Sequence, residues 1–297
     1  MPNGAMISPE DEGSKNARAF VAVAGPTASG KTALAISLAK ERNGEIISVD
    51  SRQVYRMLDI GTEKITQTEM EGIPHHLIDI RDPKDTYSAG DFVTDAARLI
   101  EDITERGKTP ILAGGTHFYF DALLYGLPES SPVNVDLRKE LEQYSSEELL
   151  NRVSAADPRR AARLDPKNRR RIIRALEIIA EHGQVPEREN KTTSYTVEWH
   201  VLNPERDILR ARIRKRLIEA LEKGLIEEVR VVREYVGDER LNELGLEYKI
   251  IGEYLRGERD KDSLLPTLSA HLWHYARRQK AWLRKLEQEA GQQAARE

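Results

Sequence analysis

The sequence predicts an α/β fold in which a parallel β-sheet core carries an all-helical inserted domain and a helical C-terminal part. Two observations predict the core: short apolar runs alternate with helical segments up to residue 126, and a glycine-rich loop joins the first run to the first helix. A third observation predicts the insertion, because strand signals stop after residue 126 and return only at residue 197.

Four short apolar runs are typical of the strands of the core. FVAVA at 20–24 and EIISV at 45–49 predict buried strands, 77–80 is a candidate third strand, and TPILA at 109–113 is the next. Helices are expected at 31–42 and 88–106, the second opening on a capping box of Ser88 and Asp91. This alternation predicts parallel βαβ units.

The rest of the chain is predicted to be mainly helical. Residues 127–196 form the insertion, in which Ser145 and Glu148 match a capping box. A strand at 197–202 returns to the sheet, one long helix bent near Gly224 follows over 204–236, and later helices break near Gly245 and Gly257. The predicted organisation is a disordered tail at 1–17, a core of 18–126 and 197–297, and the insertion at 127–196.

Composition narrows the class of protein. The 297 residues are 39% hydrophobic and carry a net charge of −4, so a nucleic-acid site must be a local basic patch. The lack of cysteine excludes disulfides, cysteine-based zinc sites and a thiol nucleophile. The polar N-terminal segment has no signal-peptide core, and no run reaches the ~18 apolar residues of a membrane span. We therefore expect a cytoplasmic protein with no membrane partner.

GPTASGKT at 25–32 matches the phosphate-binding pattern G-x-x-x-x-G-K-[ST] at every fixed position. Backbone N–H groups at the start of a helix can wrap an anion, Lys31 adds a positive charge, and the Thr32 hydroxyl can bind a magnesium ion. The motif predicts a P-loop NTPase-like core with Mg²⁺ as cofactor. The predicted phosphate-binding residues are Gly25, Pro26, Thr27, Ala28, Ser29, Gly30, Lys31 and Thr32.

The acidic residue expected beside this loop comes from an unusual strand. A nucleotide hydrolase usually has a carboxylate after an apolar strand to hold magnesium, but TPILA is followed by GGT at 114–116. Asp50 instead ends the run EIISVD. Because the carboxyl ends of parallel strands face the ligand crevice, we expect the phosphate loop, Asp50 and Thr116 to share one cleft. The alternatives are that Asp50 caps the following segment and that Thr116 caps the next helix.

Seven motifs in a fixed order give a specific resemblance. GPTASGKT, DSRQVY, DIGTEK, PHHLIDI, YSAGDF, GGTHFYF and LLYGL follow one another along the chain. This succession resembles the bacterial type of tRNA dimethylallyltransferase, of the IPP transferase family, over residues 19–286. The resemblance implies transfer of a dimethylallyl group from dimethylallyl pyrophosphate to the N6 amine of adenosine at tRNA position 37, with release of pyrophosphate.

The resemblance also implies roles for single residues. The phosphate loop would hold the pyrophosphate leaving group, Asp50 would act as the general base, and Gln53 would contact the same adenine. Arg216, in RIRKR at 212–216, would stabilise the pyrophosphate, and Thr116 would orient the two substrates. For the arginines, a solvated basic helix face is the alternative.

Two basic segments are candidates for contact with RNA. Residues 159–174 contain eight Lys or Arg, and 271–285 contain five, interleaved with Trp273, Tyr275 and Trp282. A solvated charged face is the alternative. The contacts with the tRNA anticodon stem-loop implied by the resemblance are Asp50, Ser51, Arg52, Gln53, Arg138, Arg170, Arg171, Ile172, Ile173, Arg174, Tyr248, Lys249, Arg277, Arg278 and Gln279.

Two segments depart from the family pattern. Where relatives often have G-Y-R, this chain has LEYK at 246–249, which places the charge of Glu247 where RNA would approach. Where relatives often have T-R-Q, it has LWH at 272–274. We expect the local tRNA contacts to differ there.

Three other functions remain open from the sequence. An isopentenyltransferase acting on free adenine nucleotides would share the phosphate loop and Asp50, but it needs neither the helical insertion nor the basic C-terminal segment. A P-loop small-molecule kinase is favoured by the loop alone. A tRNA-binding protein without catalysis has no use for the loop and Asp50 together. The enzyme is expected to be a monomer.

Overall fold

The computed structural model describes residues 18–127, 134–186 and 193–294 of the chain. These residues divide into two compact units. The larger unit takes the described residues up to Leu124 and from Thr193 onward, and the smaller unit spans Tyr125–Thr192. The tail at 1–17, predicted to be disordered, lies outside the described residues.

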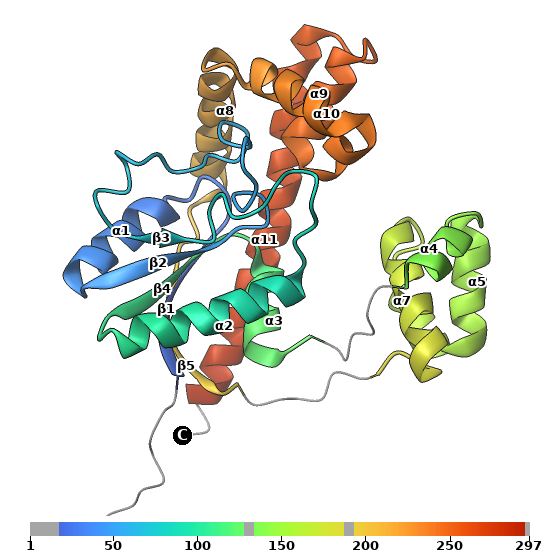
Figure 1. Cartoon of the computed structure of the whole chain (residues 1–297), viewed down its shortest axis with the longest axis horizontal. Helices are drawn as coiled ribbons and strands as arrows, with labels where there is room; N and C mark the ends of the chain where they lie inside the picture. The colour runs from blue at the N-terminus through green and yellow to red at the C-terminus, as the bar shows by residue number, and fades with distance from the viewer. Residues whose placement is uncertain (1–17, 128–133, 187–192, 295–297) are drawn as a thin grey trace, which may run out of the picture. The chain divides into compact units, whose positions relative to one another are not determined.

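The larger unit is built on a five-stranded parallel sheet with the strand order β3-β2-β4-β1-β5 (Figure 1). The strands are β1 (Arg18–Ala24), β2 (Gly44–Val49), β3 (His75–His76), β4 (Thr109–Gly114) and β5 (Tyr195–Val201). Gly114, the last residue of β4, is in register with Ala24 of β1 and with Val49 of β2. The carboxyl ends of these three strands therefore meet at one edge, and the predicted α/β core is confirmed.

Burial on both faces explains the continuous apolar runs of the central strands. Residues 20–24 of β1 and all of β2 are buried, including Glu45. The Glu45 carboxylate accepts hydrogen bonds from Arg106, Lys108 and His76. These partners, Arg106 foremost, hold the pKa of Glu45 well below its usual range. The carboxylate thus ties β2 to β3 and to the segment that enters β4.

The strand expected at 77–80 is wrong. β3 ends at His76, and Leu77 and Asp79 have φ angles of 61° and 57°. A residue in the left-handed region turns the chain away from extended geometry, so this apolar run bends instead of pairing along the sheet.

Helices connect the strands of the sheet. α1 (Lys31–Glu41) joins β1 to β2, α2 (Ala89–Glu105) joins β3 to β4, and α3 (His117–Tyr125) follows β4. The predicted capping box of α2 is confirmed, because the Ser88 side chain accepts from the Asp91 N–H while the Asp91 carboxylate accepts from the Ser88 N–H. The amino end of α1 follows directly from the phosphate loop, which aims the first N–H groups of the helix at that loop.

The C-terminal part is helical, as predicted, but the long helix expected over 204–236 is two helices. Gly224, with a φ of 102°, separates them. The elements in order are α8 (Arg206–Glu222), α9 (Leu225–Glu243), α10 (Leu246–Leu255), a 3₁₀ turn at Lys261–Ser263 and α11 (Leu264–Ala294). Figure 1 shows α11 running from the neighbourhood of α10 past the sheet toward β5. Among the described helices, none has the length and apolar character needed to cross a membrane.

The smaller unit is helical. Its elements are α4 (Val135–Leu141), α5 (Ser146–Ala156), α6 (Pro158–Ala161) and α7 (Arg169–His182). The predicted capping box of Ser145 and Glu148 is confirmed at the start of α5. Leu149, Ile172 and Ile173 belong to its buried core.

Candidate active site

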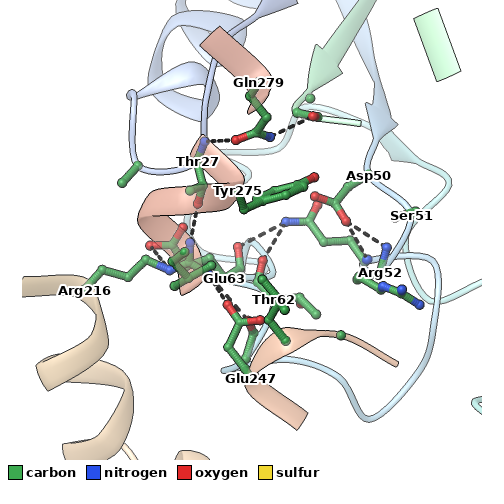
Figure 2. Close-up of a pocket in the computed structure, with 18 of the residues that line it drawn as sticks. Thr27, Asp50, Ser51, Arg52, Thr62, Glu63, Arg216, Glu247, Tyr275 and Gln279 are labelled. Atoms are coloured by element: carbon green, nitrogen blue, oxygen red, sulfur yellow. Dashed lines mark hydrogen bonds and ion pairs between the residues drawn. The ribbon is translucent and has the colours of Figure 1, made fainter. Parts of the chain in front are cut away.

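A cavity of about 340 Å³ lies at the carboxyl ends of β1, β2 and β4 in the larger unit. The phosphate loop, the segment after β2, the loop at 61–63 and helices α8, α10 and α11 supply its walls. Figure 2 shows most of these side chains. The lining residues are Thr27, Ala28, Lys31, Thr32, Asp50, Ser51, Arg52, Gln53, Gly61, Thr62, Glu63, Ala113, Gly114, Gly115, Arg216, Leu244, Gly245, Leu246, Glu247, Tyr248, Leu272, Tyr275, Arg278 and Gln279.

The phosphate loop is held in shape by its own residues. A Cβ at Gly25 would lie 2.6 Å from the Ser29 Oγ and 2.8 Å from the Leu202 carbonyl oxygen, so only glycine fits there. Lys31 Nζ donates to the Pro26 carbonyl oxygen at 2.7 Å and closes the loop on itself. Burial lowers the pKa of Lys31 to about 8. In the part of the chain that the structure describes, this carbonyl oxygen is the one hydrogen-bond acceptor of the half-buried ammonium group, which is therefore well placed to bind an anion.

Gln279 ties this loop to the sheet from α11. Its side-chain oxygen accepts from the Thr27 N–H at 3.0 Å, and its side-chain nitrogen donates to the Gly115 carbonyl oxygen at 2.7 Å. The side chain is buried, and a Cβ at Gly115 would lie 2.6 Å from its nitrogen. The structure therefore gives Gln279, which the family pattern presents as a tRNA contact, a tether between the phosphate loop and the end of β4 (Figure 2).

Asp50 uses one carboxylate oxygen as a cap. Oδ1 accepts from the backbone N–H groups of Arg52 at 2.8 Å and Gln53 at 3.3 Å. Within the described part of the chain, Oδ2 has no recorded hydrogen-bond partner, and Asp50 lines the cavity. The capping role and a role toward a ligand are thus compatible, because they use different oxygens.

Thr116 joins the ends of two strands. Its Oγ1 accepts from the Ser51 N–H at 3.1 Å, and its own N–H donates to the Val49 carbonyl oxygen at 3.1 Å. Among the described residues, its hydroxyl hydrogen has no hydrogen-bond acceptor and can therefore be donated to a ligand. The residue adjoins Gly115, which lines the cavity, but Thr116 itself is not among the lining residues.

Arg216 reaches the phosphate loop from α8. It donates to the Thr27 hydroxyl and pairs with Glu63 at 3.1 Å and with Glu247 at 3.5 Å (Figure 2). Arg212, one turn earlier, donates to the Ser29 carbonyl oxygen at 3.3 Å. Both arginines thus contact the phosphate loop, so the alternative of a helix face that contacts only solvent does not describe them.

Glu247 faces this arginine inside the cavity and does not project into solvent. Its side chain is 12% exposed, the same fraction as that of Arg216. Burial raises its pKa, and the charge of Arg216 opposes that rise. The carboxylate therefore belongs to the wall of the cavity.

The other expected tRNA contacts of the larger unit differ in exposure. Ser51, Arg52 and Arg278 line the cavity, and Lys249 and Arg277 are exposed. Tyr248 is buried, and its hydroxyl donates to Glu228 at 2.7 Å.

The two tryptophans of α11 have contacts within the larger unit. Trp282 donates from its indole nitrogen to Asp121 at 3.1 Å and stacks on His117 with ring centroids 4.4 Å apart. Trp273 lies under the guanidinium groups of Arg206 and Arg210.

The expected contacts of the smaller unit separate into surface and interior residues. Arg170 and Arg171 are exposed, while Arg138 and Arg174 pair with the buried Glu177 at 2.7 Å and 2.9 Å. The side chains of Ile172 and Ile173 are in the hydrophobic core. Because these two side chains pack inside the unit, a contact of tRNA with Ile172 and Ile173 stays a prediction that concerns their backbone atoms.

A magnesium ion fits the cavity only together with a ligand. The described residues contain no group of three or more His, Cys, Asp or Glu that could hold a metal ion. Thr32 and Asp50 line the same cavity, so a hydroxyl and a carboxylate oxygen are available. Mg²⁺ commonly keeps several waters and is bound by one or two protein oxygens and a substrate phosphate, which matches this set.

Comparisons with known proteins agree with the geometry. The "tRNA dimethylallyltransferase 1" of Citrifermentans bemidjiense is 42% identical over 271 residues, covering 89% of each chain. The tRNA dimethylallyltransferase of Halalkalibacterium halodurans is 41% identical and covers 89% of this chain and 88% of its own.

Two solved structures resemble this one. The tRNA isopentenylpyrophosphate transferase of Bacillus halodurans aligns with a TM-score of 0.68 at 40% identity, over 90% of this chain and 87% of the other. A eukaryotic dimethylallyltransferase acting on tRNA aligns with a TM-score of 0.77 at 31% identity, over 89% of this chain and 69% of the other. Residues 53–286 match the family described as "IPP transferase", and the chain therefore belongs to the IPP transferase family.

Proposed function

We propose that this protein transfers a dimethylallyl group from dimethylallyl pyrophosphate to the N6 amine of adenosine at tRNA position 37, beside the anticodon. One observation carries the proposal: a single cavity joins the phosphate loop to a carboxylate at the end of β2 whose Oδ2 has no hydrogen-bond partner among the described residues. The relatives are named tRNA dimethylallyltransferases, and the eukaryotic neighbour is described as acting on tRNA, which supports tRNA as the acceptor.

The leaving group would be stabilised by the phosphate loop. Breaking the allylic C–O bond transfers its electron pair to pyrophosphate, and the growing negative charge meets backbone N–H groups, Lys31 and Arg216. Arg216 would exchange its pairing with Glu63 and Glu247 for the stronger charge of the pyrophosphate. Mg²⁺, with Thr32 as protein ligand, would supply further charge neutralisation when bound.

The acceptor amine would be activated by Asp50. An adenine N6 amine is a weak nucleophile because its lone pair is delocalised into the ring. As N6 forms its bond to the allylic carbon, the Oδ2 of Asp50 accepts one N6 proton, which leaves a neutral secondary amine. Thr116, which bonds the Ser51 N–H beside Asp50, would keep this carboxylate at the strand end.

The base must leave the anticodon loop to enter the cavity, as in base flipping. Arg52, Arg278 and the exposed Lys249 and Arg277 are the proposed contacts of the larger unit with the stem-loop. Arg170 and Arg171 are those of the smaller unit. With tRNA as substrate, we also propose a monomeric enzyme of the cytoplasm.

A labelled-donor assay tests the proposal. The protein is incubated with labelled dimethylallyl pyrophosphate, Mg²⁺ and unmodified tRNA, and the digested tRNA is analysed for N6-dimethylallyladenosine by mass spectrometry. AMP replaces tRNA in one control, and ATP replaces the donor in another. Labelled product on AMP but not on tRNA would favour the free-nucleotide enzyme, and stoichiometric ADP formation would favour a kinase.

A further inference from the structure

Glu228, on α9, binds three consecutive backbone N–H groups of the loop 59–64. Its carboxylate accepts from Asp59 at 3.0 Å, Ile60 at 2.6 Å and Gly61 at 2.9 Å. The fourth bond comes from the Tyr248 hydroxyl. Each carboxylate oxygen accepts two hydrogen bonds, so the charged side chain binds three backbone N–H groups and one hydroxyl group at once.

The loop is also packed tightly against α10. A Cβ at Gly61 would lie 2.8 Å from the Tyr248 hydroxyl oxygen, so the backbone approaches this buried ring as closely as glycine permits. At the far end of the loop, Lys64 Nζ donates to the Tyr55 carbonyl oxygen at 2.8 Å and to Asp79 at 2.6 Å. The loop is therefore fixed at both of its ends.

Two carbonyl groups of this loop fix the side-chain amide of Gln53. Its nitrogen donates to the carbonyl oxygens of Thr62 at 3.2 Å and Glu63 at 3.3 Å, while its oxygen accepts from the Ser48 hydroxyl at 3.1 Å. The opposite rotamer would place the amide oxygen against two carbonyl oxygens. Both amide hydrogens are used, so what Gln53 can still offer a ligand in the cavity is an acceptor lone pair.

We propose that Glu228 is a positioning residue for base selection: it fixes the loop 59–64, and the loop holds Gln53 as a hydrogen-bond acceptor in the cavity that Asp50 also lines. An exocyclic amine, as in adenine, donates to both acceptors. A 6-oxo purine, as in guanine or hypoxanthine, would oppose oxygen to oxygen. The inference rests on the proposed function, because it assumes that a purine enters this cavity.

We call this connection from Glu228 through the loop 59–64 to Gln53 the relay. A double-mutant cycle with Glu228→Gln and Gln53→Leu tests it. The amide of Glu228→Gln turns an NH₂ group toward two of the four donors, which releases the loop without changing the volume of the side chain. Glu227→Gln is the matched control, since Glu227 is the exposed neighbour on the same helix and pairs with Arg230. The measured quantity is the ratio of Kd values for anticodon stem-loops carrying inosine or adenosine at the target position.

The wild type should prefer adenosine by about 10- to 100-fold, the cost of leaving buried polar groups unpaired. Glu228→Gln and Gln53→Leu should each lower this ratio at least about fivefold, and the double variant should lower it no further, because both act through one amide. Glu227→Gln should keep the wild-type ratio. Thermal melting of each variant shows whether it is folded.

Results that contradict the relay differ from the result that contradicts the proposed function. An unchanged ratio in folded Glu228→Gln, or additive losses in the double variant, would overturn the relay. So would a higher KM for dimethylallyl pyrophosphate with the ratio intact, because the loop also contacts Arg216. If Glu228→Gln does not fold, Tyr248→Phe removes one of the four bonds and should lower the ratio less, and an unchanged ratio there overturns the relay. Failure of the wild type to bind either stem-loop would instead contradict the proposed function.

Discussion

The two carboxylate oxygens of Asp50 have separate roles: Oδ1 caps the following segment, and Oδ2 is the proposed proton acceptor. In Asp50→Asn, Oδ1 can still accept from the N–H groups of Arg52 and Gln53, but the second position becomes a donor and accepts no proton. We expect the single-turnover rate to fall about 10²- to 10⁴-fold, the usual contribution of a general base. Thermal stability and tRNA affinity should change little. A near-normal single-turnover rate would assign the base to another group.

Lys31 gives the donor site a pH dependence. Burial lowers its pKa to about 8, so the ammonium form predominates below this value and is lost as the pH rises through it. Pyrophosphate affinity should therefore decrease above pH 8 by up to about tenfold per pH unit.

Calorimetry with inorganic pyrophosphate from pH 6.5 to 9.5 measures this dependence, and Lys31→Met is the control because it has no titrating amine. The difference between the two proteins isolates the lysine from the titration of pyrophosphate itself. Parallel curves for both would show that Lys31 does not supply the charge.

Helix α11 contacts the phosphate loop through the side chain of Gln279. Gln279→Leu removes the bonds to the Thr27 N–H and the Gly115 carbonyl oxygen at similar side-chain size. The phosphate loop loses its tether, so the KM for dimethylallyl pyrophosphate should rise about tenfold, the loss of roughly 1.4 kcal/mol. Arg277→Leu, two residues earlier and exposed, is the comparison and should act mainly on tRNA affinity. A loss of tRNA affinity alone in Gln279→Leu would restore its role as a tRNA contact.

Elements with strong local signals were predictable from sequence. Buried strands produce unbroken apolar runs, and the capping boxes of α2 and α5 follow from four-residue patterns. The strand prediction at 77–80 was wrong because Leu77 and Asp79 adopt left-handed backbone conformations, which their residue types do not predict. Apolar character alone does not distinguish a strand from a bent buried segment.

Local sequence patterns could not predict the long-range contacts that hold the site together. Gln279 and Glu228 contact segments more than 150 residues away in the chain, and on their own helices they look like ordinary polar positions. The available signal was indirect, since Gly61 and Gly115 each lie where another side chain comes close. The motif order placed the phosphate loop, Asp50 and Arg216 together, but it did not supply the side chains that hold them.

Across the whole molecule, the reacting groups and the arginine-rich helix α7 lie in different compact units. The larger unit holds the cavity with the phosphate loop and Asp50. The smaller unit presents Arg170 and Arg171 at its surface and keeps Ile172 and Ile173 inside. The smaller unit therefore has a hydrophobic core of its own beneath this basic surface, and substitutions of its exposed arginines test tRNA affinity separately from the chemistry.

Arg170→Ala/Arg171→Ala should weaken tRNA binding and flatten its salt dependence. Each lost phosphate contact lowers the slope of log K against log salt by somewhat under one unit, because fewer counterions are released. The rate at saturating tRNA should persist, since Asp50 and the phosphate loop are untouched. The measurement is tRNA affinity at several salt concentrations, with Lys40→Ala/Arg98→Ala as a control that removes equal charge from exposed positions on α1 and α2.

AMP should be a very poor acceptor, because binding energy from the stem-loop would position the adenine. Unchanged affinity and slope, together with efficient use of AMP, would make the smaller unit a scaffold and favour an enzyme of free adenine nucleotides.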